Sequence, residues 1–298
     1  MSDPRVDQVL LNPPNAYNGA QNAATFLDLP YLRLVRDILD YGDSHQDRTG
    51  VGTLSLFGQS CRYDLRERFP LLTCRKVPWR WTVEELRWFL SGSTNAKDLE
   101  DRGVMWWKSW GDPETRELGP TYGRMWREYP NKHETFVDQW ENLLKGLGDD
   151  PDSRRHIVTL WHPAHSPYCS LPPCHGIALQ FKISTDDRGI KRLHSLMLQR
   201  SADVILGVPI NIASYSLLTC AIAEYLGINP GVFTHFMGDA HIYKNHVDVA
   251  RELLERPLRE SPFLRLGAFP LAALYGNGNV PDITNYNPHP AIKAEVAV

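Results

Sequence analysis

The spacing of apolar residues along the chain predicts several helices. Between Leu32 and Leu39 apolar residues recur at intervals of three and four, which indicates an amphipathic helix that begins near Tyr31 and ends at Gly42. Similar patterns predict helices over three further segments, residues 81–90, 136–147 and 245–255. Residues 212–226 are apolar on nearly every face, so we expect that helix to be buried in the core.

Alternating and continuous apolar runs predict strands over residues 54–63, 156–161, 175–181, 196–201 and 232–243. The segments 175–181 and 196–201 are expected to pair as neighbours. Strands outnumber the strand-helix-strand signals in this sequence. We therefore predict an α+β fold, in which one large mixed β-sheet is backed by helices, one of them buried.

The chain is expected to form a single domain over residues 29–298. Residues 1–28 are rich in Asn, Pro, Ala and Gly and lack apolar periodicity, which predicts a loosely ordered N-terminal extension. No element is predicted over residues 256–285, where no clear periodicity is found.

Composition limits the classes of function. With 298 residues, 42% of them hydrophobic and 22% charged, the sequence is typical of a globular protein, and a net charge of −3 gives no basic footprint for nucleic acid. The five cysteines form no Cys-x-x-Cys pair, so neither a disulfide framework nor a zinc site is favoured, and a reducing cytoplasm fits best. We expect neither a secretory signal nor a membrane span, because the first residues carry no basic segment before an apolar run and no 18-residue apolar stretch occurs. Neither a Gly-x-Gly-x-x-Gly motif nor a phosphate-loop motif is present.

Candidate chemistry gathers between residues 171 and 215. Cys174, Arg200, Asp203 and Asn211 fall on two strand-like segments and at the start of the buried helix. A thiol reacts as the thiolate, so its pKa of about 8.5 must fall, and a nearby arginine would lower it. The alternative is that Cys174 is a small buried apolar residue, the usual place of an intracellular cysteine.

Four motifs in this region and beyond it carry a resemblance. Leu-Pro-Pro-Cys-His ends at His175, Gln-Arg-Ser-x-Asp ends at Asp203, and Leu-Gly-Val-Pro-x-Asn-Ile-Ala-Ser-Tyr and Gly-Asp-Ala-His-Ile-Tyr follow in order. Together they resemble folate-dependent thymidylate synthase, and the similarity runs from about residue 30 to the last residue. The resemblance implies a catalytic domain of the thymidylate synthase type, with 2′-deoxyuridine monophosphate (dUMP) as substrate and 5,10-methylenetetrahydrofolate as co-substrate, without a metal.

The resemblance also implies the catalytic roles. The Cys174 thiolate would add to C6 of the pyrimidine, which activates C5 as a nucleophile. Glu85 aligns with the general acid/base carboxylate, and Tyr122 would present its hydroxyl near C5. Charge that develops on O4 would be stabilised by Asn211 and by water held between Glu85 and His175. Asp203 completes the expected catalytic set.

Two of these residues have simpler structural readings. Thr82 and Glu85 have capping-box spacing, so the Glu85 carboxylate would then bond only the first amide of its helix. Asn211 would be the N-cap of the buried helix, a position that asparagine favours. In the catalytic reading, the Asn211 amide also selects uracil over cytosine, because it donates to O4 and accepts from N3–H.

The resemblance implies a phosphate site built from guanidinium groups. Its expected ligands are Arg48, Arg154, Arg155, Arg200 and Ser201, with Gln199 nearby, because the planar fork of arginine matches phosphate oxygens. The resembled family takes the equivalents of Arg154 and Arg155 from the other subunit, so a homodimer is expected. For Arg48, Arg154 and Arg155 the alternative is an ordinary solvated surface charge. His241 and Tyr243 would hold the 3′-hydroxyl of the sugar.

The expected folate site decides between two reactions. Its predicted residues are Trp107, Trp110, Asp203, Gly207, Ile210 and Ala297. Trp107 and the closing Glu295–Val298 segment are expected to exclude water, which favours hydride transfer and methylation. Departures from the family pattern occur nearby, at Thr73–Lys76, Trp106, Met125, Ala202 and Ile210, so a deoxypyrimidine nucleotide hydroxymethylase acting on dUMP, or on dCMP, is the alternative. A non-catalytic nucleotide-binding relative would lack a catalytic residue, and none is missing.

Overall fold

A six-stranded mixed sheet forms the centre of the computed structural model, which describes residues 25–132, 135–267, 271, 274–275 and 279–295. The strand order is β1-β2-β8-β7-β6-β5. Strands β7 and β8 run parallel, and every other neighbouring pair in this sheet is antiparallel. The bounds are β1 (Asp43–His45), β2 (Thr53–Asp64), β5 (Ile157–Val158), β6 (Ala178–Thr185), β7 (Lys191–Asp203) and β8 (Asn229–Tyr243). The α+β prediction is therefore confirmed.

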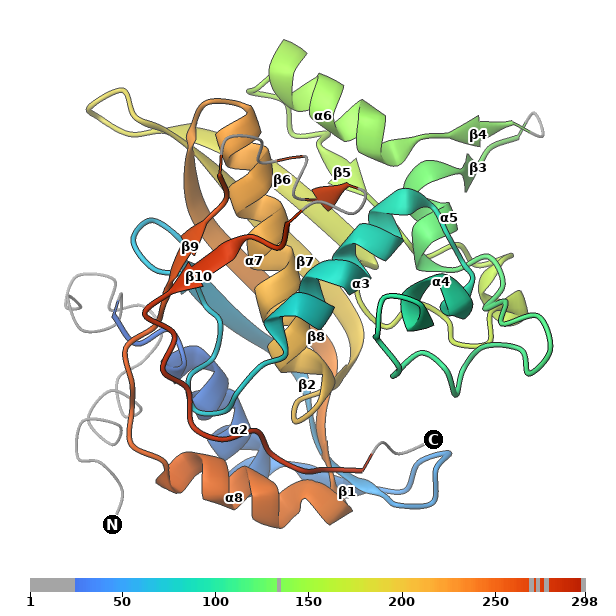
Figure 1. The fold of residues 1–298 in the computed structure, drawn as a ribbon, viewed down its shortest axis with the longest axis vertical. Coiled ribbons are helices and arrows are strands. Elements are labelled where there is room, and N and C mark those ends of the chain that lie inside the picture. Colours follow the sequence, from blue (N-terminus) through green and yellow to red (C-terminus); the bar gives the residue numbers. More distant parts are fainter. Residues whose placement is uncertain (1–24, 133–134, 268–270, 272–273, 276–278, 296–298) are drawn as a thin grey trace.

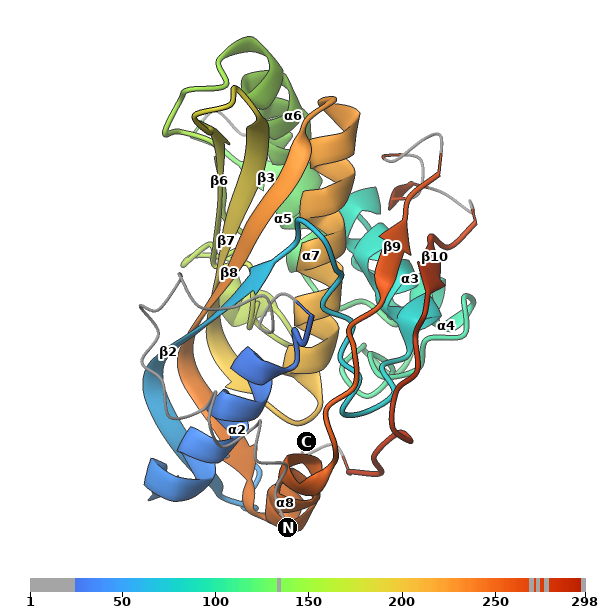
Figure 2. The ribbon, with the colours of Figure 1, turned by 90° about the vertical axis from the view of Figure 1, so that its left-hand side faces the viewer.

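The long helix α7 (Gly207–Tyr225) joins the parallel strands β7 and β8 and is buried over most of its length. Figure 2 shows α7 between the sheet and α3 (Trp79–Ser91). A helix that is covered on both sides needs apolar residues all round, which explains the uniform apolar character of its sequence. Helix α2 (Leu29–Tyr41) packs on the same face of the sheet, where Cys61 of β2 contacts Pro30.

Shorter elements surround this core (Figure 1). They are the helices α4 (Ala96–Glu100), α5 (Tyr122–Arg127), α6 (Gln139–Asp149) and α8 (Val247–Glu255), the 3-10 turns η1 (Ser166–Tyr168) and η2 (Lys244–His246), and the two-stranded sheets β3 (Tyr129–Pro130) with β4 (Phe136–Val137) and β9 (Phe263–Arg265) with β10 (Asp282–Thr284). None of the helices in the described part of the chain has the length and apolar character that a membrane crossing needs.

Most predicted elements are found, and their ends differ for local reasons. The strands predicted over 54–63, 196–201 and 232–243 lie inside β2, β7 and β8, and β6 pairs with β7 as expected. The helix predicted from Phe136 begins only at Gln139, because Phe136–Val137 pairs as β4 and the Asp138 side chain accepts from the Glu141 amide. The strand expected over 156–161 shortens to β5, and the strand expected over 175–181 begins later, at Ala178, and extends to Thr185 as β6.

Both capping alternatives are wrong. Helix α3 starts at Trp79, so Thr82 lies inside its first turn and donates to the Pro78 carbonyl instead of capping the helix. Helix α7 starts at Gly207, which places Asn211 one turn inside the helix rather than at its cap. The side chains of Glu85 and Asn211 are therefore free of these structural roles.

The expected N-terminal extension falls mostly outside the described residues, which begin at residue 25. Its last two residues, Leu27 and Asp28, are buried. The Asp28 carboxylate accepts hydrogen bonds from the amide and hydroxyl of Thr73 and from the amide of Cys74. This contact ties the start of α2 to the segment that leads into α3.

Candidate active site

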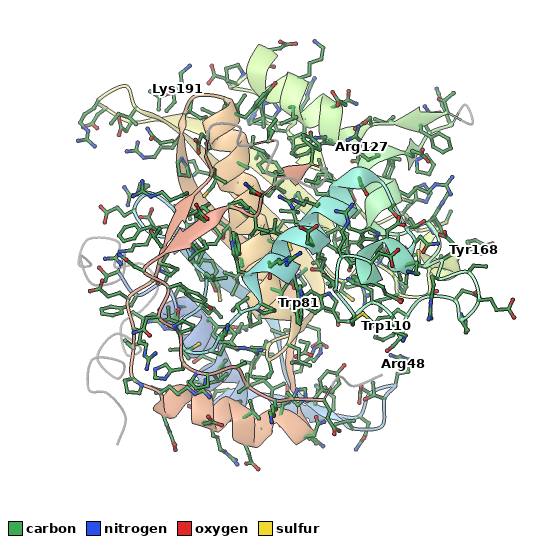
Figure 3. The ribbon with its side chains drawn as sticks, in the orientation of Figure 1. Arg48, Trp81, Trp110, Arg127, Tyr168 and Lys191 are labelled. Carbon is green, nitrogen blue, oxygen red and sulfur yellow. The ribbon has the colours of Figure 1, made fainter. Side chains whose placement is uncertain are left out.

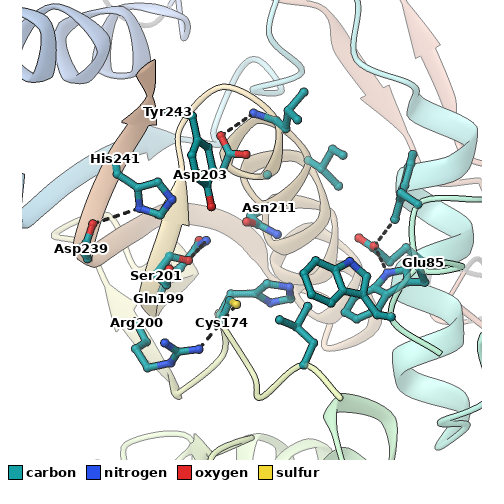
Figure 4. Close-up of a pocket in the computed structure, with 18 of the residues that line it drawn as sticks. Glu85, Cys174, Gln199, Arg200, Ser201, Asp203, Asn211, Asp239, His241 and Tyr243 are labelled. Atoms are coloured by element: carbon teal, nitrogen blue, oxygen red, sulfur yellow. Dashed lines mark hydrogen bonds and ion pairs between the residues drawn. The ribbon is translucent and has the colours of Figure 1, made fainter. Parts of the chain in front are cut away.

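A cavity of about 1020 Å³ opens where the carboxyl ends of β7 and β8 meet the first turn of α7. Strand register places Ser201 beside Asp239 and Asp203 beside His241, so both strands deliver polar side chains to one wall (Figure 4). Helix α3 and the loop after α4 form the opposite, aromatic wall. Of the predicted site residues, the cavity is lined by Arg48, Glu85, Trp107, Trp110, Tyr122, Cys174, His175, Gln199, Arg200, Ser201, Asp203, Gly207, Ile210, Asn211, His241 and Tyr243.

Cys174 lies in this cavity with a guanidinium group against its sulfur. The Nη2 of Arg200 is 3.7 Å from the Sγ of Cys174, and the backbone amide of Arg200 donates to the Cys174 carbonyl at 2.6 Å. The Arg200 side chain is further held by the Pro172 and Pro173 carbonyls, which accept from its Nη2 and Nε. The prediction that the strand containing Arg200 pairs with the segment that follows Cys174 is confirmed.

The pKa of the Cys174 thiol, however, is raised rather than lowered. Burial raises this pKa and outweighs the opposing effect of the Arg200 charge. The expectation of a lowered pKa is therefore wrong for the chain by itself, because it counted the neighbouring charge without the loss of solvent. Burial therefore favours the protonated thiol, and the Arg200 charge reduces the free energy needed to ionise it.

The backbone around Cys174 is fixed by two contacts. The Tyr122 hydroxyl accepts from the Cys174 amide at 2.7 Å, which ties the start of α5 to the nucleophile. Two residues later Gly176 has a φ of 68°, and a Cβ there would lie 2.5 Å from the Leu160 side chain. A glycine is therefore required for the chain to leave the cavity and enter β6.

His175 is buried behind the nucleophile. Its Nδ1 and the Tyr215 hydroxyl share a hydrogen bond of 2.7 Å, and burial lowers the pKa of His175 to about 3. The imidazole is neutral near pH 7, so it acts in this site as a hydrogen-bonding group and not as a cation.

Glu85 projects from the middle of α3 toward the aromatic wall. Its Oε1 accepts from the indole nitrogens of both Trp106 and Trp107, each at 2.6 Å. Burial raises the pKa of this carboxyl, and the two indole donors oppose that shift. The cavity thus holds a carboxyl group whose protonation is set by its protein surroundings, as expected of an acid/base residue.

The first turn of α7 presents an amide to the cavity. Asn211 is 5% exposed, and its side chain makes no hydrogen bond to a described residue. Asp203 accepts from the amides of Ile205 and Leu206, which starts the helix at Gly207. A buried amide without a protein partner is free to bond a ligand with one donor and one acceptor.

Polar groups from β7 and β8 line the other side. His235 donates to Gln199 Oε1 at 2.8 Å, and Gln199 Nε2 donates to the Ser201 carbonyl at 3.0 Å, so the Gln199 amide is held in one orientation. His241 donates to Asp239 at 3.0 Å, and this hydrogen bond lowers the pKa of Asp239. Burial raises the pKa of Tyr243 to about 12, so its hydroxyl stays protonated.

The aromatic wall combines four indoles with aliphatic side chains. Trp81, Trp106, Trp107 and Trp110 line the cavity together with Ile210 and with Ile292 from the C-terminal segment. Arg48 lies 6.0 Å from the ring of Trp110, and both are marked in Figure 3. Ala297 and the end of the closing segment, residues 296–298, lie outside the described residues.

The sequence decides the family to which this site belongs. A family model of thymidylate synthase matches residues 29–298. The chain belongs to the thymidylate synthase family. It is accordingly an enzyme of the thymidylate synthase type, a one-carbon transferase for C5 of dUMP, and the family uses methylenetetrahydrofolate.

Only part of the predicted phosphate site lies in the cavity of this thymidylate synthase family member. Arg48 and Arg200 line the cavity, whereas Arg154 and Arg155 do not. These two arginines are exposed and lie just before β5, at the edge of the sheet. One copy of the chain therefore supplies two of the four expected guanidinium groups.

Several lining residues were not predicted as site residues from the sequence. Arg75 and Lys76 bring two more cations to the cavity, Asp239 orients His241, and Trp81 and Ile292 extend the apolar wall. Arg75 and Lys76 stood out only as departures from the family pattern, and Asp239 lies inside the quoted Gly-Asp-Ala-His motif. Within the described part of the chain, no group of three or more His, Cys, Asp or Glu side chains is placed to hold a metal ion.

Proposed function

We propose that this protein makes dTMP by reductive methylation of dUMP at C5, with 5,10-methylenetetrahydrofolate as the source of the one-carbon unit and of the hydride. The observation that carries the proposal is the joint placement of Cys174 beside Arg200, of the unpaired Asn211 amide, and of the buried Glu85 in one cavity. These groups supply a nucleophile, a base-recognition group and an acid/base group.

The cavity suits two ligands side by side. Its volume of about 1020 Å³ lies at the upper end of the roughly 300–1,000 Å³ that small-molecule pockets span. The strand wall is polar and suits a nucleotide, while the indoles of Trp107 and Trp110 suit a flat ring system. The folate thus fits against the aromatic wall, where it would supply the carbon and then the hydride.

Phosphate binding positions the nucleotide. Arg48, Arg200 and Ser201 line the end of the cavity from one chain, and arginine forks bind phosphate oxygens in pairs. His241, oriented by Asp239, and Tyr243 would bond the 3′-hydroxyl of the sugar. This arrangement directs the pyrimidine toward Cys174 and Asn211.

The Cys174 thiol would give up its proton to solvent water, and the sulfur would then form a bond to C6. The electron pair of the C5–C6 double bond moves toward O4, where the Asn211 amide donates, while the same amide accepts from N3–H. Arg200, 3.7 Å from the sulfur, favours the ionised thiol despite burial. The ring then carries nucleophilic character at C5, which takes the one-carbon unit.

Glu85 and His175 would take part in proton transfer at O4 of the pyrimidine ring. Both are buried, and the imidazole is neutral, so together they can order a water molecule that reaches O4. A group with a raised pKa both accepts and returns a proton near neutral pH. Tyr122, whose hydroxyl is fixed at the Cys174 amide, would assist removal of the C5 proton.

A homodimer would complete the phosphate site with Arg154 and Arg155 from the partner. Support comes from the sheet face opposite α7, where alternate residues of β7 and β8 are less buried. Ile157, Leu198 and Phe236 on that face are 52%, 36% and 41% exposed. Large apolar side chains gathered on one face are typical of a subunit interface.

Hydroxymethylation of dUMP is the second candidate. It is favoured by the lining residues Trp106 and Ile210, which depart from the usual family pattern on the folate wall. In that reaction water adds where hydride would. Trp107 and the C-terminal segment near Ile292 support the first candidate, because they remove apolar wall area from solvent.

The two candidates differ in their products. The protein is incubated with dUMP and methylenetetrahydrofolate, the nucleotide is analysed by mass spectrometry, and dihydrofolate is followed by absorbance. Methylated nucleotide with stoichiometric dihydrofolate is the expected result. Hydroxymethylated nucleotide without dihydrofolate would replace the first proposal with the second, and unchanged dUMP would contradict both.

A further inference from the structure

The Glu85 carboxylate takes two indole hydrogen bonds on the same oxygen. Trp106 and Trp107 each donate to Oε1 at 2.6 Å, and the described residues make no hydrogen bond to Oε2. Trp107 is buried and Trp106 is partly buried.

The Trp106 indole is held in place for this contact. Its ring meets that of Trp81 edge to face, with centroids 5.8 Å apart and planes at 75°. Trp81 belongs to the same helix as Glu85, one turn earlier, so the helix that carries the carboxylate also packs against the ring of its donor. Packing against Trp81 therefore holds the Trp106 indole in the orientation from which it donates to Glu85.

The two indole donors are the groups that oppose the effect of burial on the Glu85 carboxyl. Tyr122, Tyr215 and His175 face this region from α5, α7 and the Cys174 loop, and Arg75 and Lys76 line the same cavity. Burial raises the pKa of both tyrosines and lowers that of His175 to about 3, so all three are uncharged near pH 7.

We propose that Trp106 is a positioning residue for the reaction, whose indole N–H acts with that of Trp107 to fix Oε1 of Glu85 and to favour the ionised form of this group against the effect of burial. The other oxygen, Oε2, is thereby left to bond water or substrate in the cavity. This inference rests on the proposed function only in taking Glu85 as the acid/base residue.

Together the two donors have two effects on the Glu85 carboxyl group. One hydrogen bond leaves a carboxylate free to rotate about its terminal torsion, whereas two donors converging from different directions define the plane of the group. Each donor also favours the charged form, because a carboxylate accepts more strongly than a carboxylic acid.

The ionisation of Glu85 can be measured without either substrate. Infrared difference spectra between the wild type and Glu85→Gln isolate the carboxyl band of Glu85, and its titration gives the pKa directly. Trp106→Phe and Trp106→Leu both lack the N–H group but differ in ring and volume. We expect both to raise this pKa by about one pH unit or more, since a hydrogen bond to a charged group contributes on that scale.

Trp79→Phe is the matched control. Trp79 lies on the same helix, outside the cavity, and donates its indole N–H to the Pro281 carbonyl at 2.8 Å. Its loss is expected to lower the melting temperature while the titration of Glu85 stays at the wild-type pH. In the active enzyme, the kinetic pKa that belongs to Glu85 should move upward in both Trp106 variants and not in the control.

An unchanged Glu85 titration in both folded Trp106 variants would overturn the proposal. A shift in Trp106→Leu alone would also overturn it, because the cause would then be lost packing and not the lost donor. Since the infrared titration needs no dUMP or folate, a shift in a protein that yields no product would contradict the proposed function and leave this inference standing.

Discussion

At the scale of single residues, we expect the choice between uracil and cytosine to depend on one atom, the side-chain nitrogen of Asn211. Asn211→Asp replaces the amide nitrogen that donates to O4 by an oxygen that accepts from an amino group, which suits cytosine. We expect turnover of dUMP to fall about 100-fold or more and the preference to move toward dCMP. Steady-state rates with both nucleotides measure this change, and an unchanged ratio of the two rates would contradict the role of Asn211.

The sequence predicted such residues better than it predicted their electrostatics. The expected pairing of segments 175–181 and 196–201 was enough to place Arg200 near Cys174, because neighbouring strands lie about 5 Å apart. The pKa of the thiol was predicted in the wrong direction, since burial depends on distant segments that close over the cavity. Trp106 likewise stood out in the sequence only as a departure, and its bond to Glu85 follows from how the loop folds back on α3.

At the scale of elements, the attachment of α2 to the segment before α3 depends on one buried carboxylate. Asp28 is 1% exposed and accepts from the Thr73 amide and hydroxyl and from the Cys74 amide. Asp28→Ala would leave these buried donors unpaired, so we expect a loss of about 3 kcal/mol in the free energy of unfolding. Urea denaturation measures it.

Asp40→Ala serves as the control for this prediction, because Asp40 is exposed on the same helix. Its effect is expected to be within about 0.5 kcal/mol. Equal stabilities of the two variants would show that the Asp28 contacts do not hold α2 in place.

The apolar pattern predicted which helices and strands form. It did not predict where they begin and end, because those positions depend on side-chain contacts. Helix α7 begins at Gly207, several residues before the predicted start, because Asp203 captures the amides that precede it. The segment 256–285 gave no prediction, and β9 and β10 pair there across a long separation in the chain. Such pairing depends on the rest of the fold and not on local pattern.

At the scale of the whole molecule, the stability is expected to fall with pH below neutrality. Burial lowers the pKa of His175 and of His235 to about 3, and the charge of His175 contributes at His235. Between the ordinary histidine pKa of about 6.5 and about 3, the unfolded chain binds protons that the folded chain does not. The free energy of unfolding should therefore decrease as pH falls, by up to about 1.4 kcal/mol per pH unit for each histidine.

Urea denaturation at several pH values between 7 and 5 tests this dependence. His235→Gln, outside the cavity, should flatten the slope, and His45→Gln, at an exposed histidine, should leave it as in the wild type. Identical slopes in the wild type and in His235→Gln would contradict the assignment.

The proposed dimer predicts that two inactive variants restore each other. The double variant Arg154→Ala, Arg155→Ala lacks the arginines given to the partner, and Cys174→Ser lacks the nucleophile. A hybrid dimer of the two contains one site with every group, so mixing and re-association should recover activity that neither variant has alone. No recovery in a mixture shown to contain hybrid dimers would place these arginines outside the partner's site.

The covalent role of Cys174 is the centre of the account. If its sulfur adds reversibly to C6 of dUMP, C5 becomes a carbanion that takes a proton from solvent, and reversal then leaves that proton on the ring. Cys169→Ser is the control, since Cys169 is partly buried and does not line the cavity.

The most direct measurement is incubation of dUMP with the protein in D₂O, without folate, followed by proton NMR of the C5 position. The account predicts that the C5 signal disappears with the wild type and with Cys169→Ser and persists with Cys174→Ser, which still binds dUMP. A C5 signal that persists with the wild type, or that disappears equally with Cys174→Ser, would contradict it.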